Sequence, residues 1–159
     1  MTSTQLQNSP QVGDIAPDFS VASTSGSEVS LSSFRGKRDV LLAFFPLAFT
    51  GTCSKELICF TEDFDQFARK GVEILPISVD SIPSLREFKN KLQMKTELLS
   101  DFKRDISRAY GVLNEDRFYS NRAYFLIDKA GRVQWSHVEG NNGQRRENSE
   151  ILAAIAQPR

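Results

Sequence analysis

Cys53 is the residue of this chain that is best placed to act as a nucleophile. It follows an apolar run at residues 40–45 and precedes a stretch with helical periodicity, so we predict a strand that delivers a thiol to the start of a helix. The unpaired N–H groups and the positive dipole of a helix N-terminus favour the thiolate, which is the nucleophilic form of cysteine. The sequence therefore predicts a reactive thiol at this position.

The predicted helix covers roughly residues 53–70. Four apolar residues recur at intervals of three and four, which is the spacing of one buried helical face: Leu57, Phe60, Phe64 and Phe67. Gly71 follows as a C-cap, and Thr50 or Thr52 is available as an N-cap. Because Cys53 continues the apolar face by one turn, it can also be read as a small buried hydrophobic residue without chemistry.

The remaining pattern predicts an α/β fold with a central mixed sheet flanked by helices. Continuous apolar runs at residues 40–45 and 72–79 are typical of central strands, although Pro76 predicts a bulge or an unpaired side in the second run. A hairpin is expected from residues 124–128 and 132–137. Short strands are expected around the turn at 23–27, and further helices at 82–92, 105–110 and 149–156.

Composition limits the classes of function. With 159 residues, 40% hydrophobic content and 12 Phe, we expect one domain over residues 11–159 behind a flexible tail at 1–10. Lys plus Arg and Asp plus Glu number 20 each, so no net charge attracts nucleic acid or an anionic membrane. The absence of a signal-like segment and of a long apolar span predicts a soluble cytoplasmic protein. In that compartment, two cysteines indicate redox chemistry or no role rather than a structural disulfide.

At this point the chain resembles the peroxiredoxins. The pattern Pro-x-x-x-Thr-x-x-Cys at Pro46, Thr50 and Cys53 is similar to their peroxidatic motif, and Arg122 stands where the family has an essential arginine. The stretch from Phe45 to Gly51 is closest to the alkyl hydroperoxide reductase E type, a small and largely one-cysteine subgroup. Further similar stretches include 16–19, 77–80, 99–101 and 109–112, so the resemblance covers nearly the whole chain.

The resemblance implies a thioredoxin fold and a thiol-dependent peroxidase for hydrogen peroxide, organic hydroperoxides or peroxynitrite. It implies no cofactor, and the sequence offers no metal-ligand cluster or phosphate-binding glycine loop. It further implies a homodimer whose oxidised cysteine is reduced by a thioredoxin-like or glutaredoxin-like protein or by a low-molecular-weight thiol.

Peroxide chemistry explains why these residue types are needed together. The Cys53 thiolate attacks one peroxide oxygen while negative charge develops on the other. Arg122 has a permanent charge and several donors, so it can stabilise the thiolate and hold the peroxide oxygens at once. Thr50 supplies a hydroxyl that can donate to the thiolate or accept from the peroxide. By resemblance, Pro46 shields the sulfur from water and Glu56 orients the arginine. Each residue also has an interpretation without chemistry. Thr50 would be only an N-cap and Pro46 only a strand terminator, while Glu56 would be a solvated first-turn acid and Arg122 a surface charge.

Cys59 departs from the one-cysteine pattern. Six residues on an ideal helix give about 9 Å of rise, which separates the two Cα atoms by about 10 Å and is too far for a disulfide. Some related peroxiredoxins place a resolving cysteine in this helix and unwind it, so we hypothesise that oxidation of Cys53 melts residues 50–60 and that Cys59 captures the sulfenic acid. The alternative is a one-cysteine peroxidase in which an external thiol resolves Cys53.

Two other functions compete with the peroxidase. A thiol–disulfide oxidoreductase normally requires Cys-x-x-Cys, which this chain lacks. A non-enzymatic redox sensor or chaperone would use a loosened helix to expose Phe60 and Phe64. We expect His137, the only histidine, and Trp135 to be structural.

Overall fold

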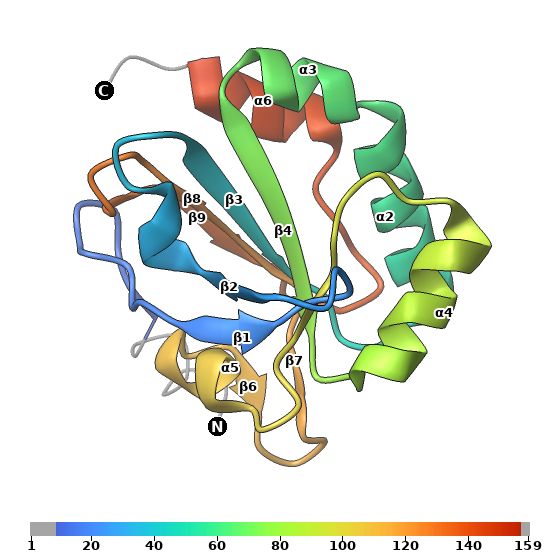
Figure 1. The fold of residues 1–159 in the computed structure, drawn as a ribbon. Helices are drawn as coiled ribbons and strands as arrows, with labels where there is room; N and C mark the ends of the chain where they lie inside the picture. Colours follow the sequence, from blue (N-terminus) through green and yellow to red (C-terminus); the bar gives the residue numbers. More distant parts are fainter. Residues whose placement is uncertain (1–8, 157–159) are drawn as a thin grey trace.

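The computed structural model describes residues 9–156, and a five-stranded mixed sheet forms its centre (Figure 1). The strand order is β5-β4-β3-β8-β9. The parallel part consists of β3 (Asp39–Phe44), β4 (Val72–Ser78) and β5 (Leu99–Ser100), and the antiparallel part adds β8 (Ala123–Ile127) and β9 (Val133–Val138). The predicted mixed α/β sheet is therefore confirmed.

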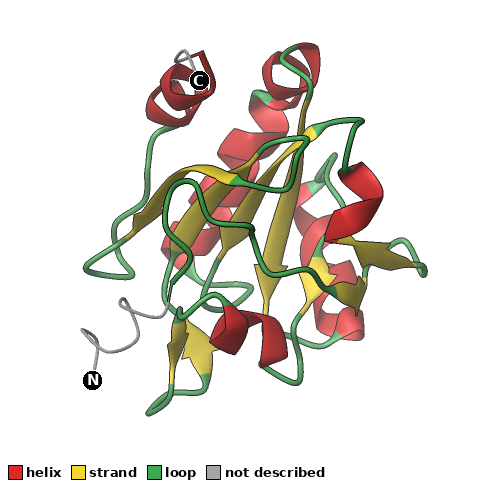
Figure 2. Cartoon of the chain, turned by 90° about the vertical axis from the view of Figure 1, so that its left-hand side faces the viewer, coloured by secondary structure: helices red, strands yellow, loops and turns green. Residues whose placement is uncertain are grey.

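Two apolar cores cover the two faces of this sheet. Because side chains alternate along a strand, Leu41 and Ala43 of β3 enter one core while Leu42 and Phe44 enter the other. The first core packs under α2 (Gly51–Glu62), α3 (Phe64–Arg69), α4 (Ile82–Leu92) and α6 (Asn148–Ala156). The second lies under a hairpin of β1 (Ser20–Ala22) and β2 (Glu28–Ser30), the 3-10 helix η1 (Leu31–Phe34), and α5 (Asp105–Ala109). Figure 2 shows the sheet between these two layers.

The prediction of one helix over residues 53–70 is wrong in its extent. The segment forms α2 and α3, which meet at Asp63 (φ −99°, ψ 11°). Asn148 gives a physical reason, because its Nδ2 donates to the Cys59 carbonyl and to the Asp63 carboxylate, both at 2.9 Å, and so satisfies groups at the end of α2. The break also leaves Phe64, which the periodicity placed on the buried face, only half-buried.

Other elements agree closely with expectation. Helix α4 begins after Ser81, whose side chain accepts from the Ser84 N–H, and has its proline in the first turn. In β4, Pro76 is paired with β3, but the ladder with β5 covers only Ile77 and Ser78, so the predicted unpaired side is found. The short hairpin of β6 (Leu113–Asn114) and β7 (Tyr119–Ser120) was not predicted.

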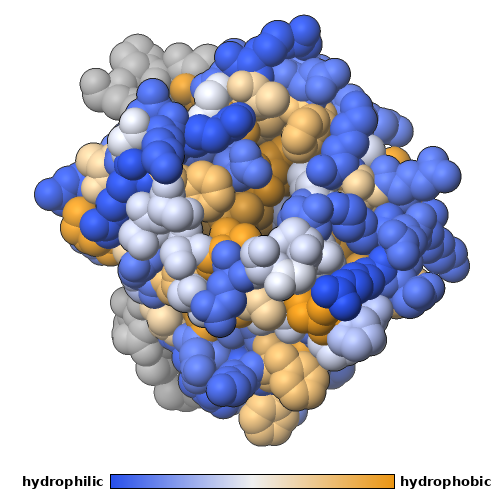
Figure 3. All heavy atoms as spheres, in the orientation of Figure 1, coloured by the Kyte–Doolittle hydropathy of each residue, from blue (hydrophilic) through white to orange (hydrophobic). Residues whose placement is uncertain are grey.

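The expected flexible tail falls mostly outside the described residues. Its last two members, Ser9 and Pro10, are buried, and the Ser9 hydroxyl donates to the carbonyl of Gly111. Hydrophilic residues dominate the face shown in Figure 3, where hydrophobic ones show in a central hollow and in smaller patches toward the edges.

Candidate active site

The candidate site lies at the start of α2, where the chain leaves β3. Thr50 is the N-cap residue, and Cys53 is the third residue of the helix. The Cys53 side chain is only 1% exposed and belongs to the apolar core together with Phe45 and Leu57. It nevertheless has a charged neighbour, because Nη2 of Arg122 lies 3.0 Å from Sγ. The reading of Cys53 as a purely apolar filler therefore does not fit its surroundings.

Arg122 reaches the sulfur from the position just before β8, the strand that pairs antiparallel with β3. It is 1% exposed, so its charge is buried. The guanidinium is held on several sides: Nη1 donates to the Glu56 carboxylate at 2.9 Å, and Nη2 donates to the Asn142 carbonyl at 3.2 Å as well as to Cys53. The Asn142 side chain also accepts from the Arg122 backbone N–H at 3.0 Å. Both ends of the arginine are thus fixed.

Glu56 is the buried counter-ion of this arginine. It lies three residues after Cys53 on α2 and is 2% exposed, so it is not the solvated acid of the alternative interpretation. Burial raises the pKa of Glu56, and the nearby Arg122 charge and the Tyr124 hydroxyl act in the opposite direction. Burial also disfavours the charge of Arg122, but Glu56 and Cys53 outweigh this and raise its pKa. The guanidinium therefore stays charged beside the sulfur.

The space above the sulfur is small. Pro46, Thr50, Cys53, Tyr119 and Arg122 are among the residues that line a cavity of about 230 Å³. The Thr50 hydroxyl donates to the Leu47 carbonyl at 2.8 Å, so its proton is committed and its lone pairs are left to accept. Of the two roles predicted for this hydroxyl, acceptance from a bound peroxide is the one that this geometry leaves open. Although Thr50 occupies the N-cap position, its side chain makes no capping hydrogen bond.

One polar atom at this site has no partner within the described residues. Nε of Arg122 is buried and makes no hydrogen bond to the protein, whereas the two terminal nitrogens are engaged. A buried N–H without an acceptor is costly, typically about 1 to 3 kcal/mol. The arrangement can therefore gain from an oxygen acceptor placed against the guanidinium.

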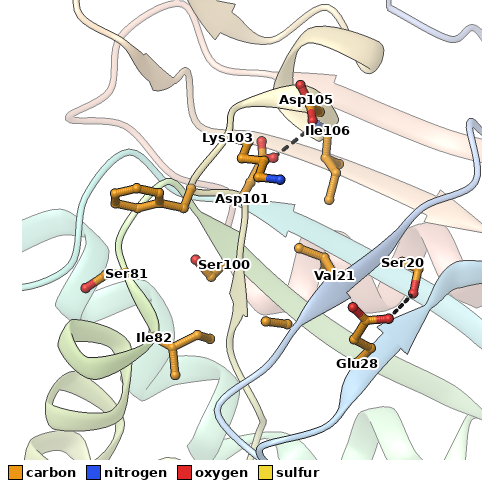
Figure 4. A pocket seen from close by; sticks show the side chains of 12 residues that line it. Ser20, Val21, Glu28, Ser81, Ile82, Ser100, Asp101, Lys103, Asp105 and Ile106 are labelled. Atoms are coloured by element: carbon orange, nitrogen blue, oxygen red, sulfur yellow. Dashed lines mark hydrogen bonds between the residues drawn. The ribbon is translucent and has the colours of Figure 1, made fainter.

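A second cavity, of about 500 Å³, shares no lining residue with the first. Figure 4 shows Ser20 and Glu28 of the β1–β2 hairpin on one side of it and Asp101 on the other. These groups already have partners inside the chain, since Ser20 donates to Glu28 and Asp101 accepts from Ser107. We find no chemistry there that resembles the Cys53 site.

Comparison with known proteins places this geometry in a family. The family model described as the AhpC/TSA family matches residues 12–136. The chain is a peroxiredoxin of this family. It is 35% identical over 148 residues to alkyl hydroperoxide reductase E of Mycobacterium tuberculosis, covering 91% of this chain and 97% of that protein. It is 36% identical over 156 residues to the chloroplastic 2-Cys peroxiredoxin BAS1 of Hordeum vulgare, covering 92% and 74%.

Solved peroxiredoxin structures agree with the architecture. The reduced 2-Cys peroxiredoxin of Plasmodium vivax superposes with a TM-score of 0.85 and 39% identity, and the match covers 91% of this chain and 79% of that one. The predicted thioredoxin-like fold and the assignment to peroxiredoxins close to the alkyl hydroperoxide reductase E type are thus confirmed. The peroxiredoxin is a thiol-dependent peroxidase, an oxidoreductase that acts on peroxide.

The structure brings the five residues singled out from the motif to one place. Cys53, Arg122 and Glu56 form a contact chain, and Pro46 and Thr50 line the cavity above it. Cys59 is half-buried on α2 and is not among the residues that line the cavity; both cysteines are free thiols. His137 is paired with Glu139 at 3.0 Å, and Trp135 packs against the first core, as expected of structural residues.

Sequence reasoning missed three residues that hold the site together: Tyr124, Asn142 and Asn148. Tyr124 carried a usable signal, because residues two apart in a strand share a face and a tyrosine in a fully buried strand needs a partner for its hydroxyl. Arg122 and Tyr124 therefore both face α2. The two asparagines lie in or just after a loop and offered no periodicity.

Two classes of site are absent from the part of the chain that the structure describes. No group of three or more His, Cys, Asp or Glu side chains between residues 9 and 156 is arranged to hold a metal ion. None of the helices in that range is long and apolar enough to cross a bilayer.

Proposed function

We propose that Cys53 is the peroxidatic cysteine of this peroxidase and that Arg122, Glu56, Thr50 and Pro46 are its supporting residues. The observation that carries the proposal is the 3.0 Å contact between Nη2 of Arg122 and Sγ of Cys53 inside a buried site. A cation at this distance stabilises the thiolate, and the effect is strong because little water screens it.

The reaction follows from these contacts. Cys53 Sγ attacks one peroxide oxygen, a sulfur–oxygen bond forms and the oxygen–oxygen bond breaks. The departing oxygen carries the electron pair and takes up a proton as water or alcohol, leaving a sulfenic acid. Arg122 stabilises the charge on the oxygens, and its unpartnered Nε supports a role in holding them. Thr50 accepts from the peroxide O–H, and Pro46, which has no N–H, helps to keep water from the sulfur.

For the second step we propose an intramolecular disulfide between Cys53 and Cys59. The sulfenic sulfur of Cys53 is attacked by the Cys59 thiolate, and the hydroxyl leaves as water. Both residues lie within the 12 residues of α2, so the bond requires that part of this helix unwinds.

Two features of α2 support such unwinding. The side chain of its N-cap residue Thr50 makes no capping hydrogen bond to α2, and a missing cap typically costs a helix about 1 kcal/mol. The first turn of α2 also has no acidic residue. The chain also breaks at Asp63, so α2 can open without pulling on α3.

Mass spectrometry after one equivalent of hydrogen peroxide tests both steps. We expect a disulfide between residues 53 and 59 in the wild type and a sulfenic acid, trapped by dimedone, in Cys59→Ser. A stable sulfenic acid in the wild type with Cys59 free would refute the intramolecular step and favour resolution by an external thiol. Failure of Cys53 to oxidise would refute the first step.

The remaining partners are proposed from the family relation. We propose that a thioredoxin-like or glutaredoxin-like protein or a low-molecular-weight thiol reduces the disulfide, and that the enzyme works in the cytoplasm as a homodimer. The exposure of Phe49, half accessible beside the active-site loop, supports a protein contact near the site. Sedimentation of the reduced protein should give the mass of a dimer, and a monomer at micromolar concentration would contradict this.

A further inference from the structure

Tyr124 of β8 is fully buried and is not among the residues that line the active-site cavity. Its hydroxyl donates to Oε2 of Glu56, while the backbone N–H of Arg146 donates to that same hydroxyl at 3.0 Å. Because a backbone N–H can only donate, Arg146 occupies a lone pair of the tyrosine oxygen, and the hydroxyl proton is donated to Glu56. The two carboxylate oxygens of Glu56 are therefore divided between Tyr124 and Arg122.

This division matters for the charge that reaches the sulfur. Glu56 and a Cys53 thiolate compete for the same guanidinium, which contacts them through Nη1 and Nη2. A donor on the far oxygen of Glu56 draws negative charge away from the arginine and leaves more of its positive charge for the sulfur. In a site that is almost closed to water, no solvent donor can replace it.

We propose that Tyr124 is a positioning residue for the peroxidase reaction and that it acts through Glu56 on Arg122, so that its hydroxyl sets how strongly the guanidinium stabilises the Cys53 thiolate. Burial, with Glu56 alongside, raises the pKa of Tyr124, so the phenol keeps the proton that it donates. The Arg146 contact further ties this chain of groups to the segment that carries Asn142.

This inference rests on the proposed role of Cys53, and the test separates the two. The rate of Cys53 oxidation by hydrogen peroxide is measured against pH by rapid quenching and mass spectrometry. Tyr124→Phe should lower the rate at neutral pH by about tenfold, as expected for one hydrogen bond to a charged group, and move the midpoint of the pH profile upward. Tyr110→Phe is the matched control. Tyr110 is equally buried but lies on the other face of the sheet, and this substitution removes one hydrogen bond, from the Tyr110 hydroxyl to the Pro17 carbonyl.

A second substitution keeps the shape of the side chain. A fluorinated tyrosine at position 124 has a more acidic hydroxyl and should donate more strongly to Glu56, so the midpoint should move downward instead. In a Glu56→Gln background, the effect of Tyr124→Phe should largely disappear, since the two residues act in series.

Wild-type pH profiles in both Tyr124 variants, or a full Tyr124→Phe effect in the Glu56→Gln background, would overturn the inference and leave the peroxidase intact. If Tyr124→Phe does not fold, the fluorinated protein alone decides. A wild-type protein whose Cys53 reacts no faster than an ordinary thiol would instead refute the proposed role of Cys53.

Discussion

Replacing Arg122 by lysine isolates the geometry of the guanidinium from its charge. Removing the charge altogether, as in Arg122→Met, would leave Glu56 buried without a counter-ion at 2% exposure, and breaking a buried pair in this way costs about 3 to 5 kcal/mol. That loss of stability would obscure any effect on the reaction. Lysine keeps one positive charge, so the fold is retained.

The size of the rate loss expected for Arg122→Lys follows from the contacts of the guanidinium. The guanidinium makes separate hydrogen bonds to Glu56, Cys53 and the Asn142 carbonyl, whereas one ammonium group on a flexible stem cannot reach all of them with the same geometry. We expect the lysine to stay with Glu56, because Glu56 is the closest charged partner. The lost hydrogen bond to the sulfur is worth about 1.5 to 3 kcal/mol, which corresponds to a rate about 10 to 150 times lower.

Competition for hydrogen peroxide against a haem peroxidase measures this rate without an optical signal from the protein. Arg132→Lys is the matched control, because Arg132 is exposed and its side chain donates to the Gly13 carbonyl, away from the Cys53 site. The oxidation rate of this variant should equal that of the wild type. The reasoning would be refuted if Arg122→Lys oxidised Cys53 as fast as the wild type while remaining folded.

Three further predictions concern other parts of the account. Thr50→Val, which keeps the shape but removes the acceptor oxygen, should slow oxidation about three- to tenfold, and Thr50→Ser should restore most of the rate in the same assay. Asn148→Ala removes the amide that donates to the last turn of α2, so it should lower the unfolding free energy by about 1 to 3 kcal/mol. It should also speed formation of the disulfide between Cys53 and Cys59, measured by quenched mass spectrometry, and slower formation would contradict this prediction. Partial burial raises the pKa of Glu97, but Lys89 and Thr24 outweigh this and lower it below its ordinary 4.5. Ionised Glu97 therefore stabilises the fold fully at neutral pH, and this contribution is lost as pH falls below 4.5. The unfolding free energies of Glu97→Gln and wild type, measured with denaturant, should converge in acid. A difference between them that grows in acid would contradict the lowered pKa.

Periodicity and motif spacing predicted much of the fold. The apolar runs at β3 and β4 were found close to their expected places, because these strands are buried on both faces and therefore read as continuous hydrophobic sequence. The expected hairpin of β8 and β9 was also found. Cys53 and Arg122 were paired from the resemblance alone. Helix periodicity could not have paired them, since 69 positions of sequence separate them.

What the sequence did not reveal depends on tertiary contacts. The break at Asp63 follows from an amide supplied by Asn148, 85 positions later in the chain, and no local pattern encodes it. The solvated reading of Glu56 was possible because the predicted helix began at residue 53, which placed Glu56 in its first turn, where a glutamate is usually exposed. In the structure α2 begins at Gly51, and the buried Arg122 and Tyr124 stabilise Glu56 in its buried position. Thr50 occupies the N-cap without capping, because its hydroxyl turns back to the Leu47 carbonyl.

The central claim is that a single sulfur, held beside a buried cation, performs the reaction with peroxide. The most direct test is the second-order rate constant for consumption of hydrogen peroxide by reduced wild type, Cys53→Ser and Cys59→Ser in a single turnover. The account predicts that Cys53→Ser loses this reaction and that Cys59→Ser retains the wild-type rate. Rapid peroxide consumption by Cys53→Ser, or its loss in Cys59→Ser alone, would contradict it.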